Sequence, residues 1–113
     1  MTNDDFKTCL QGYMDACQLR IERDYATNYP RLTPPTIEAQ EGPRYVRVIV
    51  AEYYPDGRIL TRSAHSFIDK KTGDVFKPAG WKGPAKGRRS NIFASDFGMS
   101  GVLPSGRGAV YHN

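Results

Sequence analysis

The chain has 113 residues, of which 39% are hydrophobic and 25% charged, and its formal net charge is +4. This length supports one hydrophobic core and leaves little room for a second, so we predict a single domain over residues 1–113. The sequence has no apolar run long enough for a membrane span and no signal-peptide pattern, which argues against secreted, membrane-spanning and multidomain proteins. We find no catalytic motif, and we expect a non-enzymatic protein with no cofactor, no metal site and no membrane partner.

Residues 3–27 predict an amphipathic helix that ends before Pro30. Apolar side chains recur there with helical spacing and form one stripe: Phe6, Leu10, Tyr13, Met14, Cys17, Ile21 and Tyr25. The two cysteines, Cys9 and Cys17, would lie about 12 Å apart along this helix. That separation is too long for a disulfide bond, so we expect two reduced thiols, as in a cytosolic protein.

Residues 28–43 predict an extended connector, because this stretch holds four prolines: Pro30, Pro34, Pro35 and Pro43. Residues 44–53 give the clearest strand signal, with Val46, Val48 and Val50 on one face.

A second strand is predicted from Arg58 to Asp69, after a turn rich in Pro, Asp and Gly. Strict alternation over this strand puts Ser66 on one face and His65 on the other. A short hairpin loop then leads into a third strand, which starts at Asp74 and which Pro78 stops.

Together these elements predict an α+β fold, with one amphipathic helix packed on a three- to four-stranded antiparallel sheet within residues 44–78. Residues 79–113 are predicted to form a long basic, Gly/Pro-rich loop and a Gly-rich C-terminal part. Within that part, 92–94 can form a helical turn or a short strand, and 108–111 can add an edge strand. An exposed sheet edge would also allow a second copy of the chain to pair with the first.

The positive charge is concentrated in residues 70–89, which hold seven basic residues and one acid, Asp74, whereas the other 93 residues carry nine basic and eleven acidic ones. The only tryptophan, Trp81, lies in the middle of this basic segment. The candidate site residues are Lys70, Lys71, Lys77, Trp81, Lys82, Lys86, Arg88 and Arg89.

Clustered Lys and Arg attract phosphates, an aromatic ring stacks on unpaired bases, and Gly and Pro let the backbone follow a flexible strand. The segment therefore favours binding of single-stranded or otherwise flexible nucleic acid, and the choice between DNA and RNA stays open. Two alternatives remain. The segment can dock on an acidic protein surface, where Trp and Arg are common anchors. It can also be an ordinary solvated loop whose Trp81 packs back into the core and whose charges keep the protein soluble.

Two further features are open at this stage. Tyrosines and arginines around the first strand pair can form a second patch on the exposed sheet face or ordinary cross-strand pairs: Tyr45, Tyr53, Tyr54, Arg44, Arg47, Arg58 and Arg62. His65 can be the general base of a small nuclease, but a half-buried histidine bonded to the backbone is the more common arrangement.

The block FIDxxTGDVFKPAxWKxPAKxxR, which begins at Phe67 and ends at Arg89, resembles a block in small bacteriophage and viral-metagenome proteins, mostly labelled hypothetical. The ending at 108–111 resembles their C-terminus. The resemblance implies a phage protein that acts in the bacterial cytoplasm or in the virion, and it implies no activity. It adds a phage protein-interaction module, either a virion component or an inhibitor that docks on a host protein, as the alternative function.

Overall fold

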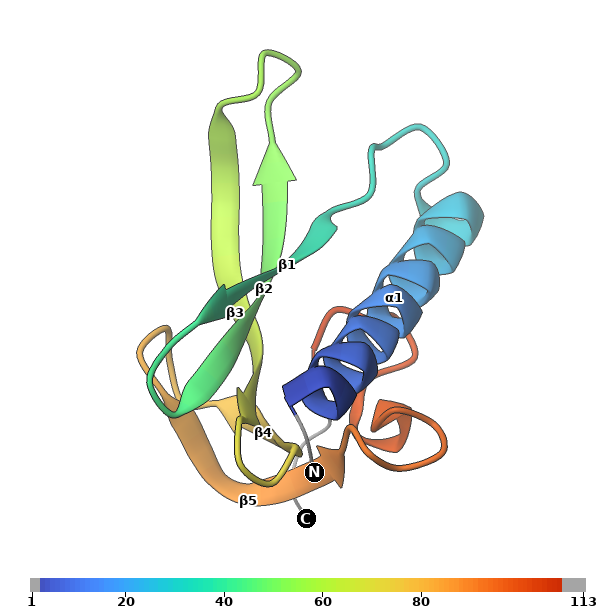
Figure 1. Ribbon diagram of the computed structural model, residues 1–113. Coiled ribbons are helices and arrows are strands. Elements are labelled where there is room, and N and C mark those ends of the chain that lie inside the picture. The colour runs from blue at the N-terminus through green and yellow to red at the C-terminus, as the bar shows by residue number, and fades with distance from the viewer. Residues whose placement is uncertain (1–2, 109–113) are drawn as a thin grey trace.

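The computed structural model describes residues 3–108 and shows one helix packed against a five-stranded antiparallel sheet. Figure 1 shows the long helix lying across one side of a strongly bent sheet. The strands follow one another in chain order across the sheet. The elements are α1 (Asn3–Asn28), β1 (Thr36–Glu41), β2 (Tyr45–Tyr53), β3 (Ile59–Asp69), β4 (Asp74–Pro78), β5 (Pro84–Asn91) and the 3-10 turn η1 (Met99–Gly101).

The predicted α+β class and the N-terminal helix are confirmed, and the helix ends at Asn28, one residue later than predicted. Its apolar stripe forms the buried face, since Tyr13, Cys17 and Ile21 are fully buried. Cys9 is only half-buried, and both thiols are free. The strand number was wrong, because the sheet has five strands rather than three or four.

One of the additional strands, β1, lies inside the predicted proline-rich connector. It pairs antiparallel with β2, and Ile37 opposes Val50. The polar sequence TIEAQE gave no strand signal because β1 is an edge strand, and only Ile37 packs against the core.

The other additional strand, β5, lies inside the segment predicted as a basic loop. It pairs with β4, with register shifts on both sides of Phe76. Its sequence PAKGRRSN lacks alternation because the strand is irregular, and Gly87 adopts a φ of 92°. Only the turn between β4 and β5, residues 79–83, remains a loop.

The hydrophobic core lies between α1 and the facing side of the sheet. Val46 and Val48 of β2, Ile68 of β3 and Val75 of β4 meet the helix there, together with Ile92 from the segment after β5. Burial of side chains of this size stabilises the fold by about 1.5–3 kcal/mol each.

β3 contains an irregularity that changes the direction of one side chain. Ser66 pairs with Val48 and Ala64 pairs with Ile49, so His65 is the extra residue of a β-bulge. The predicted alternation was therefore wrong at this point, since His65 and Ser66 both turn toward Tyr13 of α1.

Residues 92–108 form a series of turns that close the core beside α1. Arg20 holds this segment by donating Nη1 to the carbonyl oxygens of Met99 and Val102, at 3.1 and 2.9 Å. The tripeptide 92–94 lies in a turn rather than a strand. The edge strand predicted at 108–111 lies outside the described residues, apart from Gly108.

The distal half of the β2–β3 hairpin projects beyond the rest of the molecule (Figure 1). We call this part, residues 53–62, the arm. It is exposed throughout, including Tyr53, Tyr54, Ile59 and Leu60.

Candidate nucleic-acid interface

The face of the sheet that points away from α1 carries an aromatic cluster, and we call this side the open face. Phe67 of β3 pairs with Phe76 of β4, and the ring of Tyr45 in β2 meets both rings edge-on, with centroid distances of 6.3 and 6.1 Å. Arg44 lies over Tyr45, with its guanidinium carbon 5.0 Å from the ring centroid. Aromatic and arginine side chains are thus gathered on one sheet surface.

Trp81, in the turn between β4 and β5, folds back onto this open face. The guanidinium carbon of Arg47 lies 4.3 Å from the centroid of the Trp81 ring, and that of Arg62 lies 5.8 Å away. Arg47 also donates its Nε to the Trp81 carbonyl oxygen at 2.7 Å. Trp81 remains 40% exposed, so part of its ring is open to a ligand.

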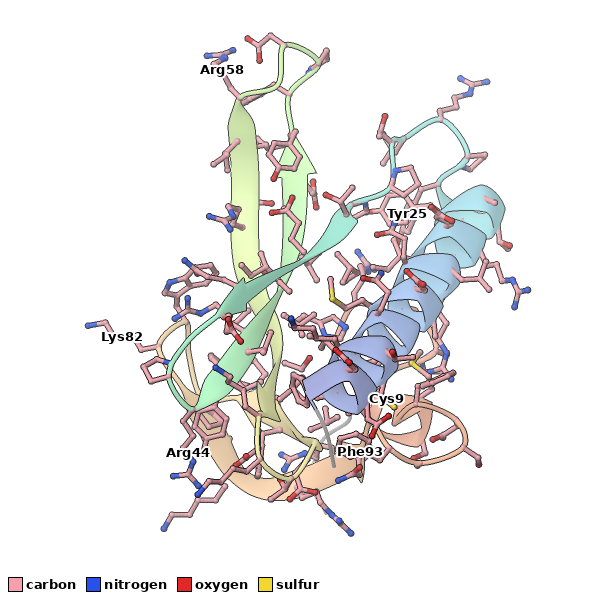
Figure 2. All side chains as sticks on the ribbon, in the orientation of Figure 1. Cys9, Tyr25, Arg44, Arg58, Lys82 and Phe93 are labelled. Carbon is pink, nitrogen blue, oxygen red and sulfur yellow. The ribbon has the colours of Figure 1, made fainter. Side chains whose placement is uncertain are left out.

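A cavity of about 360 Å³, the first cavity, lies beside this contact. The turn between β1 and β2 forms one wall, and Tyr45 and Phe67 lie at its aromatic side. Three cationic side chains line it: Arg44, Arg47 and Lys82. Figure 2 shows Arg44 at the start of β2 and Lys82 extending outward from the β4–β5 turn.

Two further cavities adjoin the first. The second cavity, of about 330 Å³, lies between β3 and the β4–β5 turn. It shares no lining residue with the first, but its Trp81 contacts Arg47 of the first cavity and directly precedes Lys82. The third cavity, of about 470 Å³, shares Pro43 and Arg44 with the first and is also lined by Lys70 and Lys71. We call the surface formed by these three cavities the basic track.

The carboxylates along the basic track are paired. Glu41 accepts from Lys70 at 3.1 Å, Asp69 pairs with Arg44 at 3.6 Å and Glu38 pairs with Arg62 at 3.8 Å. Asp69 also caps the β3–β4 turn, where it accepts from the backbone N–H groups of Lys71 and Thr72. These acids hold the arginines in place and reduce the local positive charge without cancelling it.

The structure separates the eight predicted site residues into two groups. Lys70, Lys71, Trp81 and Lys82 line the basic track. The others lie on β4 and β5 and line none of the three cavities: Lys77, Lys86, Arg88 and Arg89.

Arg88 and its partner Asp74 illustrate the second group. Arg88 Nη1 lies 3.3 Å from Asp74 Oδ1, which also accepts from Asn91. Partial burial raises the pKa of Asp74, but the hydrogen bonds from Asn91, Thr72 and Arg88 outweigh this effect and bring the pKa below its usual value. Arg88 is therefore engaged in stabilising the β4–β5 pair.

The sequence suggested two separate patches: the basic segment around Trp81, and a group of tyrosines and arginines around the first strand pair. In the structure, part of the second patch lies beside the first. Arg44, Tyr45, Arg47 and Arg62 line or adjoin the basic track through Trp81. The remaining members lie on the arm: Tyr53, Tyr54 and Arg58. Figure 2 places Arg58 at the arm's tip, well away from Arg44 and Lys82.

Sequence reasoning missed several residues that line the track, and two of them are informative. Phe67 lines the first cavity, and Pro43 lines the first and third cavities. Phe67 is only 3% exposed, but it lies between Ser66 and Ile68, which both face the core, and this alternation of side-chain direction places it on the open face. Nothing local indicated that the turn holding Pro43 would lie beside Lys82.

His65 does not belong to this surface, because it is 1% exposed. Its Nε2 donates to the Gly106 carbonyl oxygen at 2.8 Å, which leaves Nδ1 as an acceptor for the Ser66 hydroxyl at 2.8 Å. Tyr13 in turn donates to Ser66 at 2.7 Å. Burial lowers the pKa of His65 to about 4, so the ring is neutral near pH 7. A substrate cannot reach this group.

Within residues 3–108, no cluster of three or more His, Cys, Asp or Glu side chains is arranged to hold a metal ion. Across the same residues, no helix combines the length and the apolar character needed to cross a membrane.

A family model described as "Family of unknown function (DUF7717)" matches residues 5–100, and the chain belongs to this family. No curated protein and no solved structure matches the chain.

Proposed function

We propose that this member of the family binds single-stranded or flexible nucleic acid along the basic track, without catalysis and without sequence specificity. The contact of Trp81 with Arg47 and Arg62 carries the proposal. This contact places the basic segment around Trp81 and the arginines of the sheet on one surface. A ligand with regularly spaced phosphates requires such a continuous positive surface.

The chemistry of the track matches the two forces that hold unpaired strands. Exposed cations, together with the half-buried Lys70, provide phosphate contacts: Arg44, Arg62, Lys71 and Lys82. Trp81, which is 40% exposed, provides a stacking surface. The track also bends around the β1–β2 turn from the first to the third cavity, a path that a flexible strand can follow.

A duplex is a poorer ligand for this surface. Readout of the major groove usually places a helix or a two-stranded ribbon in the groove. The only long helix of the described residues, α1, packs its apolar stripe against the core and shows acidic side chains such as Asp15 and Glu22 to solvent. The projecting two-stranded arm exposes apolar side chains such as Ile59 and Leu60, and its Arg58 is paired with Asp56 at 2.6 Å.

The test is fluorescence polarisation of labelled oligothymidylate and oligouridylate between about 50 and about 200 mM salt. If about five phosphates are contacted, the logarithm of the association constant should fall against the logarithm of salt concentration with a slope of about −3.5. The comparison of the two oligomers also decides between DNA and RNA. Absence of binding to both at the lower salt concentration would overturn the proposal.

A matched pair of variants locates the binding surface. Arg44→Ala should reduce the magnitude of the salt slope by about 0.7, the share of one phosphate contact on a single strand. Arg23→Ala removes an exposed arginine from α1 and should leave the slope unchanged. Equal effects of the two substitutions would contradict binding on the track.

A second candidate function is a phage protein-interaction module that docks on an acidic protein through the same track. The observation that favours it is the exposed apolar arm, where Ile59 is 57% and Leu60 45% exposed and whose last residue, Arg62, also lines the track. The strength of apolar contacts depends little on salt concentration. The affinity for a protein partner should therefore fall less than the affinity for phosphates as the salt concentration rises. On the resemblance of the basic segment to phage proteins, either function would operate in the bacterial cytoplasm or the virion.

A further inference from the structure

The second cavity differs in chemistry from the first. Trp81 forms one wall, Arg62 is its only charged lining residue, and the other lining residues are small: Ser63, Ala64, Pro78, Ala79 and Gly80. The first cavity instead carries the three cations Arg44, Arg47 and Lys82 and one carboxylate, Glu41, which is paired with Lys70. One cavity therefore suits a planar, weakly polar group and the other suits an anion.

The dimensions of the second cavity fit a single planar group. Its volume of about 330 Å³ is at the lower end of the range for small-molecule pockets. Nothing lies within 4 Å of the position of a side chain at Gly80, so the cavity is open at the turn. The Arg47 guanidinium fixes the indole ring, which pre-organises the wall for stacking.

We propose that the second cavity is a nucleobase subsite, in which one unpaired base stacks on Trp81 while an adjacent phosphate lies in the first cavity. This inference rests on the proposed function. It narrows the class of ligand, because the subsite requires a strand that carries bases, whereas the rest of the track would accept any flexible polyanion. Arg62 borders the base, Arg44 and Lys82 contact the phosphate, and Arg47 holds the Trp81 ring in place between the two cavities.

The test compares oligothymidylate with an abasic deoxyribose-phosphate oligomer of the same length and charge, again by polarisation. Stacking of one base should make the oligothymidylate bind about tenfold more tightly. Ala64→Leu fills the second cavity and should reduce this ratio to about one. Ala26→Leu adds the same side chain at an exposed position on α1 and should preserve the tenfold ratio.

Trp81→Leu gives an independent measurement, because it removes the stacking ring from an exposed turn and leaves β3 unchanged. It should abolish the preference for the base-bearing strand. Circular dichroism of each variant confirms that the fold is retained.

The outcomes separate the subsite from the function on which it rests. Equal affinity of the unmodified protein for both oligomers overturns the subsite and leaves nucleic-acid binding intact. A tenfold preference that survives both Ala64→Leu and Trp81→Leu also overturns it, because the base would then bind elsewhere. Failure to bind either oligomer overturns the subsite and the proposed function together.

Discussion

Arg47 contacts Trp81 in two ways: its guanidinium carbon lies 4.3 Å from the ring centroid, and its Nε donates to the Trp81 carbonyl oxygen at 2.7 Å. Gln40 of β1 fixes the same arginine by accepting from Nη1 at 2.6 Å. The position of the β4–β5 turn over the open face therefore depends on a side chain from β2.

Replacing Arg47 with alanine should release Trp81 from the sheet. We expect the fluorescence maximum of the free protein to move to longer wavelength and acrylamide to quench the emission more strongly, because Trp81 is the only tryptophan. Arg58→Ala, which removes a similar arginine–aromatic contact with Tyr54 on the arm, should leave the spectrum unchanged. An unaltered spectrum in Arg47→Ala would contradict the role of Arg47.

The stability of the fold should fall as the pH drops from about 6.5 toward 4. Burial lowers the pKa of His65 to about 4 in the folded protein, whereas the unfolded chain binds the proton near pH 6.5. The unfolded state therefore holds more protons in this window, and the free energy of unfolding should decrease by up to about 3 kcal/mol.

Urea denaturation at several pH values measures this loss. His65→Gln should be less stable at neutral pH but should lose less stability between pH 6.5 and 4, since glutamine does not titrate. The same loss in both proteins would show that another group is responsible.

Tyr13→Phe should destabilise the protein by about 1–3 kcal/mol, because it removes the hydroxyl that bonds Ser66 inside the core. The Ser66→Ala change breaks the same bond from the other side and also leaves His65 Nδ1 without its donor at 2.8 Å. A double-mutant cycle by urea unfolding should give a combined loss smaller than the sum of the two. Strict additivity would argue that the two hydroxyls act independently.

Gly106→Ala should destabilise the protein by about 1–3 kcal/mol. Gly106 adopts a φ of 76°, and a Cβ there would lie 2.6 Å from the Cys17 carbonyl oxygen and 2.8 Å from Arg20 Cβ. Gly80→Ala meets no atom within 4 Å and is the matched control, for which we expect little change in melting temperature. Similar melting temperatures for both variants would contradict the close packing of Gly106 on α1.

The elements with strong periodicity were predictable from the sequence, and the irregular ones were not. The apolar stripe of α1 and the valines of β2 repeat with the periods of a helix and a strand, so their buried faces followed directly. β1 and β5 are edge strands with few apolar residues, and their pairing depends on partners distant in sequence.

The candidate site was predictable only in part, for a related reason. Charge counting located Trp81, Lys82, Lys70 and Lys71. The β4–β5 turn packs against β2 through the contact between Trp81 and Arg47, which lies 34 positions earlier in the sequence. Spacing in the sequence does not report such contacts, and the bulge at His65 gave no local signal either.

The most direct test of the central claim is the fluorescence of Trp81 during titration with oligothymidylate at about 50 and about 200 mM salt. If the basic track binds nucleic acid, the emission should be quenched to saturation, and the affinity should be about a hundredfold weaker at the higher salt concentration. No change in emission at the lower salt concentration would contradict the claim, because a strand on the track would have to contact the exposed ring of Trp81.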